Sequence, residues 1–445
     1  MNVAVMKTKA EQALGEGLAG VAAKLPGGPD VRRARDAAIG RFETLGLPHR
    51  RIEAWKYTDL RNVWKETYTP GVGGAPSVSK ADLDAALGPL SAIDATRVVF
   101  VDSTYDASVS DLDGVEGVAG SPLALALADE TDAAAADLLR LEGKDDSAVL
   151  ALNTAYATNG AVLAVAKGVK LAKPILVVFV RAGAKPQLLT TRNVISVGED
   201  AEATLIEAYV TLPGAAEAAQ YNAATELDVA AGADVRHIKC TVDRGRVMHL
   251  SNWVVGVGAG ASYRAFQFTS GTAVARNGVD VTFKGEDAKI DVSGAFLARG
   301  SEHIDSTLVI DHAVPGCESR ELFKGVLDDE ARGIFQGKVI VRPDAQKTDG
   351  KQMAQVLMLS PNTEFDSKPE LEIYADDVVC GHGSTSADLD EDLLFYCRSR
   401  GIPEPQARAL LIESFVGEAL EKVEAEDVRE ALTELARAWL AKGTK

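Results

Sequence analysis

The chain has 445 residues, enough for one large domain or for two to three in all. Its hydrophobic content of 46% and charged content of 25% are ordinary for a soluble globular protein. The net charge of −18 argues against nucleic acid or an anionic membrane as a partner. The longest apolar run, around residues 175–180, is far shorter than the roughly 20 residues that span a bilayer. The N-terminus lacks the pattern of a secretory signal, so we expect a cytoplasmic protein.

Residues 1–145 read mainly as helices. Asp30 is the expected N-cap of a helix that stops at Gly46, and Ser79 with Asp82 resembles a capping pair before a second helix. Further along, the pattern predicts a strand over residues 96–102 and a helix over residues 121–141. The stretch "TPGVGGAPS" (residues 69–77), which precedes Ser79, reads as a linker or loop. This part of the chain is predicted to be a helical N-terminal region.

From 146 to 379 the pattern changes to short apolar or alternating strands cut by glycines and acidic turns. A weak repeat runs through "VGEDAEATL", "VAAGADVRH", "VGAGASYRA", "KGEDAKIDV" and "DDEARGIFQ". Its alanines stand 32, 28, 27 and 43 residues apart, at Ala201, Ala233, Ala261, Ala288 and Ala331. Repetition in this range is typical of a stacked array, so we expect a β-solenoid. A β-sandwich is the alternative that the pattern leaves open.

Residues 380–445 become helical again. "DLDEDLLFYCRSRG" ends at a C′ glycine, Gly401, and is followed by two amphipathic stretches, "EPQARALLIESFVGEAL" and "EDVREALTELARAWLAKG". We expect a small helical unit that caps the β region or presents a ridge to a partner.

Common catalytic signatures are missing from the sequence. The four cysteines, Cys240, Cys317, Cys380 and Cys397, form no CxxC pair, which argues against a disulfide framework and a self-contained zinc knuckle. There is no Walker loop, HExxH or GxSxG motif. A β-helix enzyme acting on polysaccharides stays an alternative, but the acids sit mostly in turns such as "GED" and "DDE", where they favour turn geometry.

The stretch "VCGHGST" places Cys380 and His382 two residues apart between glycines. In an extended segment both side chains project from one face, and thiolate with imidazole suits iron or zinc. Two ligands cannot complete a metal site, so we expect the remaining ligands to come from elsewhere, such as another chain. The alternative is a glycine-rich turn that happens to carry a cysteine and a histidine.

Four segments together resemble the SufB/SufD family of iron–sulfur cluster assembly proteins: "EAWKYTDL", "SRELFKGVLDDEARGIFQGKVIVRPDAQKTDGKQ", "SKPELEIYADDVVCGHGST" and "LLFYCRSRGIPEPQARALLIESFVGEAL". The resemblance covers residues 30 to about 422. It favours the SufD branch, because a cluster-forming cysteine expected in SufB near "AQKTDGKQ" is replaced by Thr348 and Asp349. A SufB-like paralogue of the same complex is the alternative.

The resemblance implies a right-handed parallel β-helix core flanked by N-terminal and C-terminal helical regions. It implies a non-catalytic scaffold subunit that pairs with SufB through the β-helix and with the ATPase SufC through the C-terminal helices. It also implies a transient iron–sulfur cluster or iron shared with SufB, with His382 as the first candidate ligand and Cys380 as the second. A homodimer in isolation is a further possibility. We expect no nucleotide on this chain, and no flavin site is assigned to it.

In this scheme the SufC contact lies in the helix pair between Leu393 and Leu420. Arg398, Arg400 and Phe415 are the candidate contact residues, and ordinary packing between helices is the alternative role of Phe415. Dimerisation of SufC on ATP binding would then pull on the C-terminal helices and shift the SufB–SufD interface.

Overall fold

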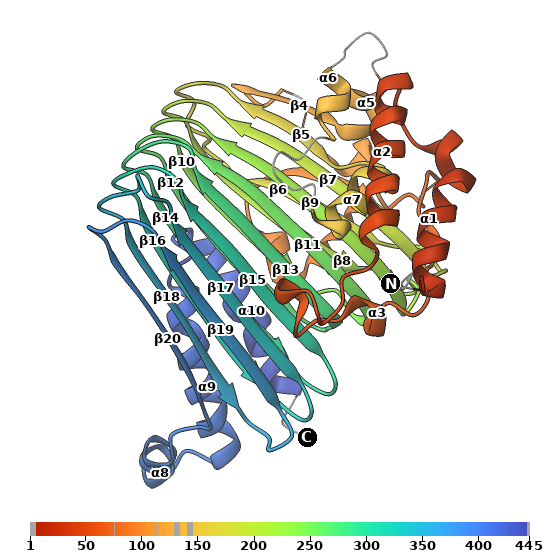
Figure 1. Ribbon diagram of the computed structural model, residues 1–445. Coiled ribbons are helices and arrows are strands. Elements are labelled where there is room, and N and C mark those ends of the chain that lie inside the picture. Colours follow the sequence, from red (N-terminus) through yellow and green to blue (C-terminus); the bar gives the residue numbers. More distant parts are fainter. Residues whose placement is uncertain (1–5, 75, 113, 129–133, 140–145, 443–445) are drawn as a thin grey trace.

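The computed structural model describes residues 6–74, 76–112, 114–128, 134–139 and 146–442. Its centre is a parallel β-solenoid of about eight turns between residues 162 and 387, as the sequence predicts. Each coil contributes one strand to each of two facing ten-stranded sheets, so strands alternate between the sheets along the chain (Figure 1). The sandwich alternative is wrong, because the strands that neighbour each other along the solenoid pair in parallel.

The two sheets are here called sheet A and sheet B. Sheet A contains β1 (Thr69–Pro70), β4 (Val118–Pro122), β5 (Ala161–Val165), β7 (Gln187–Val197), β9 (Ala218–Val229), β11 (Gly245–Val257), β13 (Thr272–Phe283), β15 (His303–His312), β17 (Arg332–Val341) and β19 (Glu364–Ile373). Sheet B contains β2 (Thr96–Val101), β3 (Thr104–Tyr105), β6 (Ile175–Arg181), β8 (Glu202–Thr211), β10 (Asp234–Thr241), β12 (Ser262–Ser270), β14 (Lys289–Ala298), β16 (Glu318–Leu327), β18 (Asp349–Met358) and β20 (Val379–Ala387).

Four of the five repeated alanines mark the start of strands of sheet B. Ala201, Ala233, Ala261 and Ala288 immediately precede β8, β10, β12 and β14 and are buried in the core between the sheets. The assignment of Ala331 to the same repeat position is wrong, because Ala331 precedes β17, which belongs to sheet A. Cys317 precedes β16 and Thr348 precedes β18, so these two residues occupy the alanine position in the later coils. A small buried side chain is what the turn requires, and Ala, Cys and Thr all meet that need.

The acidic residues of the turns serve the turn geometry that the sequence predicts. Asp200, Asp287 and Asp329 adopt positive φ angles of 55°, 59° and 60°. Aspartate tolerates this conformation better than most residues because its side chain bonds locally.

The two ends of the solenoid differ. At the N-terminal end, antiparallel strands close both sheets, with β3 on β2 and β4 on β5. At the other end, β19 and β20 are the outermost strands and each pairs with a single neighbour in its sheet, β17 and β18 respectively. The solenoid is therefore open at its C-terminal end, where both strands present unpaired backbone groups.

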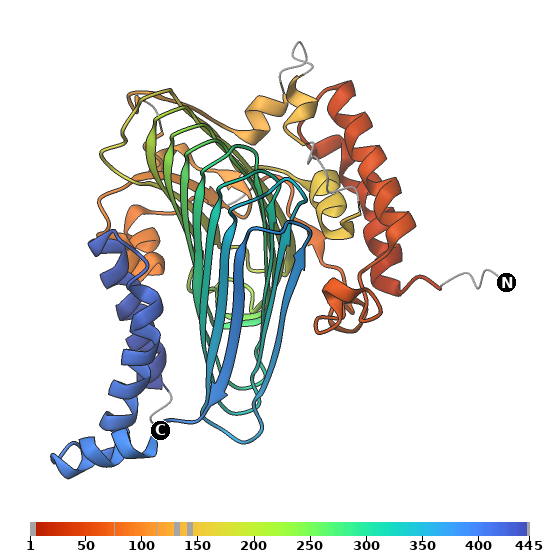
Figure 2. The ribbon, with the colours of Figure 1, turned by 60° about the vertical axis from the view of Figure 1, so that its left-hand side comes forward.

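Helices cover the outer faces of both sheets (Figures 1 and 2). Sheet A is covered by α1 (Lys9–Val21), α2 (Pro29–Leu45) and α7 (Ala148–Tyr156), and sheet B by α4 (Lys80–Leu87), η3 (Gly88–Ala92), α9 (Glu404–Leu420) and α10 (Glu426–Lys442). The remaining short helices are η1 (Ala22–Lys24), η2 (Glu53–Trp55), α3 (Leu60–Val63), η4 (Ala107–Val109), α5 (Leu123–Leu127), α6 (Ala134–Asp137) and α8 (Glu391–Ser399). No helix in the described parts of the chain is long and apolar enough to cross a membrane.

Two details of the N-terminal region differ from expectation. Gly28 is the N-cap of α2 and Pro29 its first residue, so Asp30 lies inside the first turn, where its charge still suits the helix dipole. The single helix expected over residues 121–141 is instead two short helices, α5 and α6. Residues 129–133 and 140–141 of that prediction lie outside the described residues. Ser79 does cap α4, by accepting a hydrogen bond from the backbone N–H of Asp82.

Candidate functional site at the open end of the solenoid

Cys380 and His382 lie on the last strand of the solenoid. β20 is extended from Val379 to Ala387, so the alternative interpretation of this stretch as a glycine-rich turn is wrong. Neither Gly381 nor Gly383 has a positive φ angle. Because the two candidate residues are two positions apart in a strand, their side chains project from the same face of sheet B.

The two side chains lie at different depths. Cys380 is partly buried and packs against the core between the sheets, whereas His382 is exposed. The residue opposite Cys380 in β18 is Gly350. A Cβ atom at Gly350 would lie 3.7 Å from the sulfur, so the absence of a side chain there leaves space beside the thiol. Cys380 therefore points into the open end, with His382 nearer to solvent.

The environment of Cys380 favours the neutral thiol. Burial raises its pKa, and the nearby carboxylates of Asp349 and Glu321 add to this effect, while a hydrogen bond with the Gly350 backbone opposes it. A cation placed beside the sulfur would reverse the balance, because it would stabilise the thiolate. The site is thus suited to a cysteine that ionises when a metal binds.

A column of polar side chains runs inward from His382. Gln352 of β18 is its partner in the strand register, and Glu321 of β16 is the partner of Gln352. Both inner residues are buried, and Gln352 Oε1 and both carboxylate oxygens of Glu321 have no hydrogen-bond partner among the described residues. Burial raises the pKa of Glu321 to about 8. The next residue inward is Val292, so the polar column occupies only the last three coils.

Imidazole, thiol and carboxylate at the open end are ligand types that iron accepts. Within the described residues, however, no group of three or more His, Cys, Asp or Glu side chains is arranged to hold a metal ion. The described part of the chain thus supplies at most part of a ligand set, and the edge strand that carries it is available to pair with another chain.

The predicted SufC-contact residues have different surroundings. Arg398 forms an ion pair with Glu404 at 3.3 Å, and Arg400 lies over the ring of Tyr396 at 4.7 Å. Phe415 packs partly against the hydrophobic cluster on the outer face of sheet B, and the ammonium of Lys324 lies 4.2 Å from its ring centre. The packing role that the sequence left open for Phe415 is therefore present.

The first C-terminal helix, α8, carries an exposed apolar surface that sequence reasoning missed. None of its residues is buried, and Leu393, Phe395 and Tyr396 are 52%, 72% and 55% exposed. Figure 2 shows α8 extending away from the solenoid beyond α9. The amphipathic pattern indicated a helix with a buried face, but a pattern alone does not reveal whether that face meets this chain or another one.

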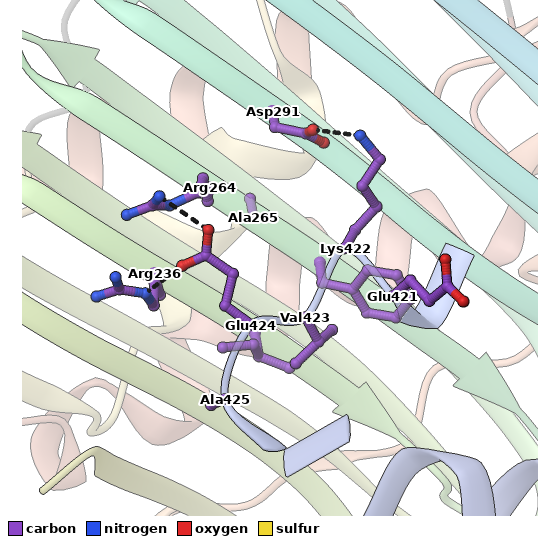
Figure 3. Close-up of a pocket in the computed structure, with 11 residues that line it drawn as sticks. Arg236, Arg264, Ala265, Asp291, Glu421, Lys422, Val423, Glu424 and Ala425 are labelled. Atoms are coloured by element: carbon purple, nitrogen blue, oxygen red, sulfur yellow. Dashed lines mark hydrogen bonds and ion pairs between the residues drawn. The ribbon is translucent and has the colours of Figure 1, made fainter. Parts of the chain in front are cut away.

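The other end of the C-terminal unit is fixed by ion pairs. In the turn between α9 and α10, Glu424 accepts hydrogen bonds from Arg236 and Arg264, each at 2.9 Å, and Lys422 pairs with Asp291 at 2.7 Å (Figure 3). These partners come from three successive strands of sheet B, β10, β12 and β14. The turn is thus anchored to the middle of the sheet, whereas α8 at the far end of α9 is not.

Two family models match the chain. Residues 179–415 match the core domain of SufBD proteins, described as SUF-system iron–sulfur cluster assembly, and residues 28–177 match the SufBD N-terminal region. The chain therefore belongs to the SufBD family of iron–sulfur cluster assembly proteins, as the sequence motifs indicate. The polysaccharide-enzyme alternative has no support in these matches.

Curated relatives agree with this assignment. The chain is 31% identical over 388 residues to the iron–sulfur cluster assembly protein SufD of Escherichia coli, covering 86% of this chain and 87% of that protein. It is 28% identical over 407 residues to the SufBD family protein slr0076 of Synechocystis, covering 87% and 86%. It is also 27% identical over 299 residues to SufD of Bacillus subtilis, covering 65% and 66%.

Proposed function

We propose that this chain is a non-catalytic scaffold subunit that supplies half of a nascent-cluster site to a complex with SufB and the ATPase SufC. In this proposal His382 is a ligand of the transient iron or iron–sulfur cluster, and Cys380 is a second ligand or a sulfur contact. SufB contributes the remaining ligands. The complex works in the cytoplasm, and the cluster is cargo that must leave again.

The observation that carries the proposal is the position of the two residues on an edge strand. β20 is the outermost strand of sheet B, so a partner strand can approach it without displacing any part of this chain. An incomplete ligand set at such an edge suits a labile site, because separation of the two chains would release the cargo.

The C-terminal helices would link this edge to SufC. The exposed apolar residues of α8, with Arg398 and Arg400 beside them, are the proposed contact, and the α9–α10 turn is the fixed point on sheet B. Movement of SufC on ATP binding would therefore act on α8 while the turn resists it. Phe415 would contribute by holding α9 on the sheet rather than by touching SufC.

The test is co-expression with SufB and SufC followed by anaerobic reconstitution of the purified complex with iron and sulfide. His382→Ala should lower the iron and acid-labile sulfide bound per complex while the three subunits still co-purify. Thr385→Ala, an exposed change on the other face of the same strand, is the matched control and should leave both unchanged. A full cluster yield in the His382→Ala complex would refute the site assignment.

A further inference from the structure

A cleft of about 560 Å³ lies between sheet B and the two C-terminal helices. Its walls are the loops that follow β14, β16 and β18, the first two turns of α9 and the end of α10. It is separate from the Cys380 and His382 edge, since neither residue lines it. The proposed SufC contact borders the cleft through the ion pair between Arg398 and Glu404, but no residue assigned to a partner or to the cluster lines it.

Several of the donors that line the cleft lack acceptors. Arg408 of α9 has no hydrogen bond or ion pair within the described parts of the chain. Arg299 stacks on the ring of Trp439 at 3.8 Å and donates from Nη2 to the Trp439 carbonyl at 2.8 Å, but its buried Nε has no acceptor. Trp439 is only 8% exposed, and its indole N–H also has no acceptor.

The acceptors of the cleft, by contrast, already have donors. Glu404 forms an ion pair with Arg398. The carboxylate of Asp328 accepts hydrogen bonds from the Ser360 hydroxyl and from the backbone N–H of Asp329. Neither carboxylate accepts a hydrogen bond from Arg299 or Arg408, so the free donors of these two residues are not used by the acids of the cleft. The unmet requirement is for hydrogen-bond acceptors carrying negative charge.

The backbone and the surrounding charges point the same way. α9 has 17 residues and begins at Glu404 in the cleft wall, and its N-cap, Pro403, offers no side-chain oxygen to the first turn. Pro405 has no N–H, so the first-turn donors are the N–H groups of Glu404 and Gln406. Lys442 lies close by, and its pKa is lowered by burial and by the positive charges of Arg244 and Arg299. With Arg299 and Arg408, Lys442 gives this place three basic groups beside the two carboxylates that line the cleft.

We propose that this cleft binds a small molecule that carries a phosphate group. Arg408, Arg299 and the N-terminus of α9 hold the phosphate, because guanidinium groups and helix N-termini are the donors that match its oxygens. The cleft is larger than a phosphate needs, and Leu359 and Ile412 provide apolar contacts for the rest of the ligand.

The test uses the purified chain without SufB or SufC, so its result does not depend on the scaffold proposal. Inorganic phosphate is titrated at constant ionic strength, and binding is followed by tryptophan fluorescence and by the midpoint of thermal unfolding. We expect saturable binding that Arg408→Gln weakens by about tenfold or more, since hydrogen bonds to charged groups are among the stronger ones. Arg51→Gln, an exposed arginine outside the cleft, should bind as the wild type does.

Two further measurements complete this test, one with a second variant and one with a second anion. Trp439→Phe keeps an aromatic ring on Arg299 and removes the indole N–H, so we expect weaker binding with the fold retained, as checked by circular dichroism. Acetate tests the alternative of a carboxylate ligand. The proposal is overturned if phosphate does not bind, or if it binds equally well to the wild type and to Arg408→Gln. Acetate binding as tight as phosphate binding would also overturn it.

Discussion

Gln352 of β18 lies directly opposite His382 of β20, and it continues the row that begins with buried Glu321 in β16. This row connects an exposed imidazole at the edge of the solenoid with a buried carboxyl group two coils further in. Because the amide oxygen of Gln352 and both oxygens of Glu321 have no partner among the described residues, the row is a polar interior that this chain leaves unsatisfied. We interpret it as the inner wall of the proposed site.

The first prediction concerns Glu321 and pH. Its folded-state pKa of about 8 is above the ordinary value of 4.5, so the folded state keeps a proton that the unfolded state has lost. The stability that Glu321 contributes is therefore present at about pH 4.5 and is lost as the pH rises to about 8. Glu321→Gln should remove this dependence and be more stable than the wild type at pH 8, by up to a few kcal/mol, with a smaller difference at pH 5.5.

Urea unfolding at the two pH values measures this difference. Glu318→Gln is the control, because Glu318 starts the same strand but is partly exposed and paired with Lys289 at 3.0 Å. We expect little change in that variant. Parallel pH profiles for wild type and Glu321→Gln would show that the carboxyl group is ionised in the folded protein.

The second prediction concerns the segment "EAWKYTDL", which ties the N-terminal region to sheet A. Arg276 of β13 stacks on Trp55 at 3.9 Å and forms a buried ion pair with Asp305 of β15. The hydroxyl of Thr58 donates to the same carboxylate. Arg276→Ala would leave Asp305 buried without its cation, and it should lower the free energy of unfolding by about 3–5 kcal/mol.

Chemical denaturation followed by circular dichroism tests this loss. Arg33→Ala removes an arginine from an exposed pair with Asp30 and should cost less than about 1 kcal/mol. Limited proteolysis should also cut the N-terminal region of Arg276→Ala faster than that of Arg33→Ala. Equal stability of the two variants would mean that the segment rests on the sheet without depending on this ion pair.

The third prediction concerns α8. Phe395→Asp changes a side chain that is 72% exposed, so the fold should lose less than about 0.5 kcal/mol. Binding of SufC should weaken by about tenfold or more, as is typical for an aromatic residue at the centre of an interface. Biolayer interferometry with purified SufC measures the affinity.

Leu125→Asp is the matched control for that experiment. Leu125 is also exposed, at 66%, but it lies on α5 at the other end of the molecule. SufC should bind this variant as it binds the wild type, and SufB should co-purify with both. An unchanged affinity of Phe395→Asp for SufC would contradict the proposal that α8 contacts SufC.

The alternation of short apolar stretches with acidic turns and the repeated alanines predicted the solenoid, because each coil needs the same buried turn residue. The repeat is assigned incorrectly after Ala288, because Cys317 and Thr348 occupy the alanine position in the later coils. A pattern based on one residue type cannot detect that cysteine and threonine fill the same space.

The proposed site was only partly visible in the sequence. Cys380 and His382 stand out because both residue types are rare and because the two residues lie two positions apart in one strand. Glu321 and Gln352 could not be connected to them, because the register between strands depends on loop lengths that vary from coil to coil. Likewise, the amphipathic pattern of α8 predicted a helix, but it could not show that none of the helix residues is buried within this chain.

The most direct test of the account is a spectroscopic search for the imidazole of His382 on the cluster. This chain, labelled with ¹⁵N-histidine, is assembled with unlabelled SufB and SufC, reconstituted anaerobically and reduced to a paramagnetic state. The account predicts ¹⁵N hyperfine coupling in pulsed electron paramagnetic resonance, and its loss in the His382→Ala complex. A reduced cluster without coupling to any labelled histidine of this chain would contradict it.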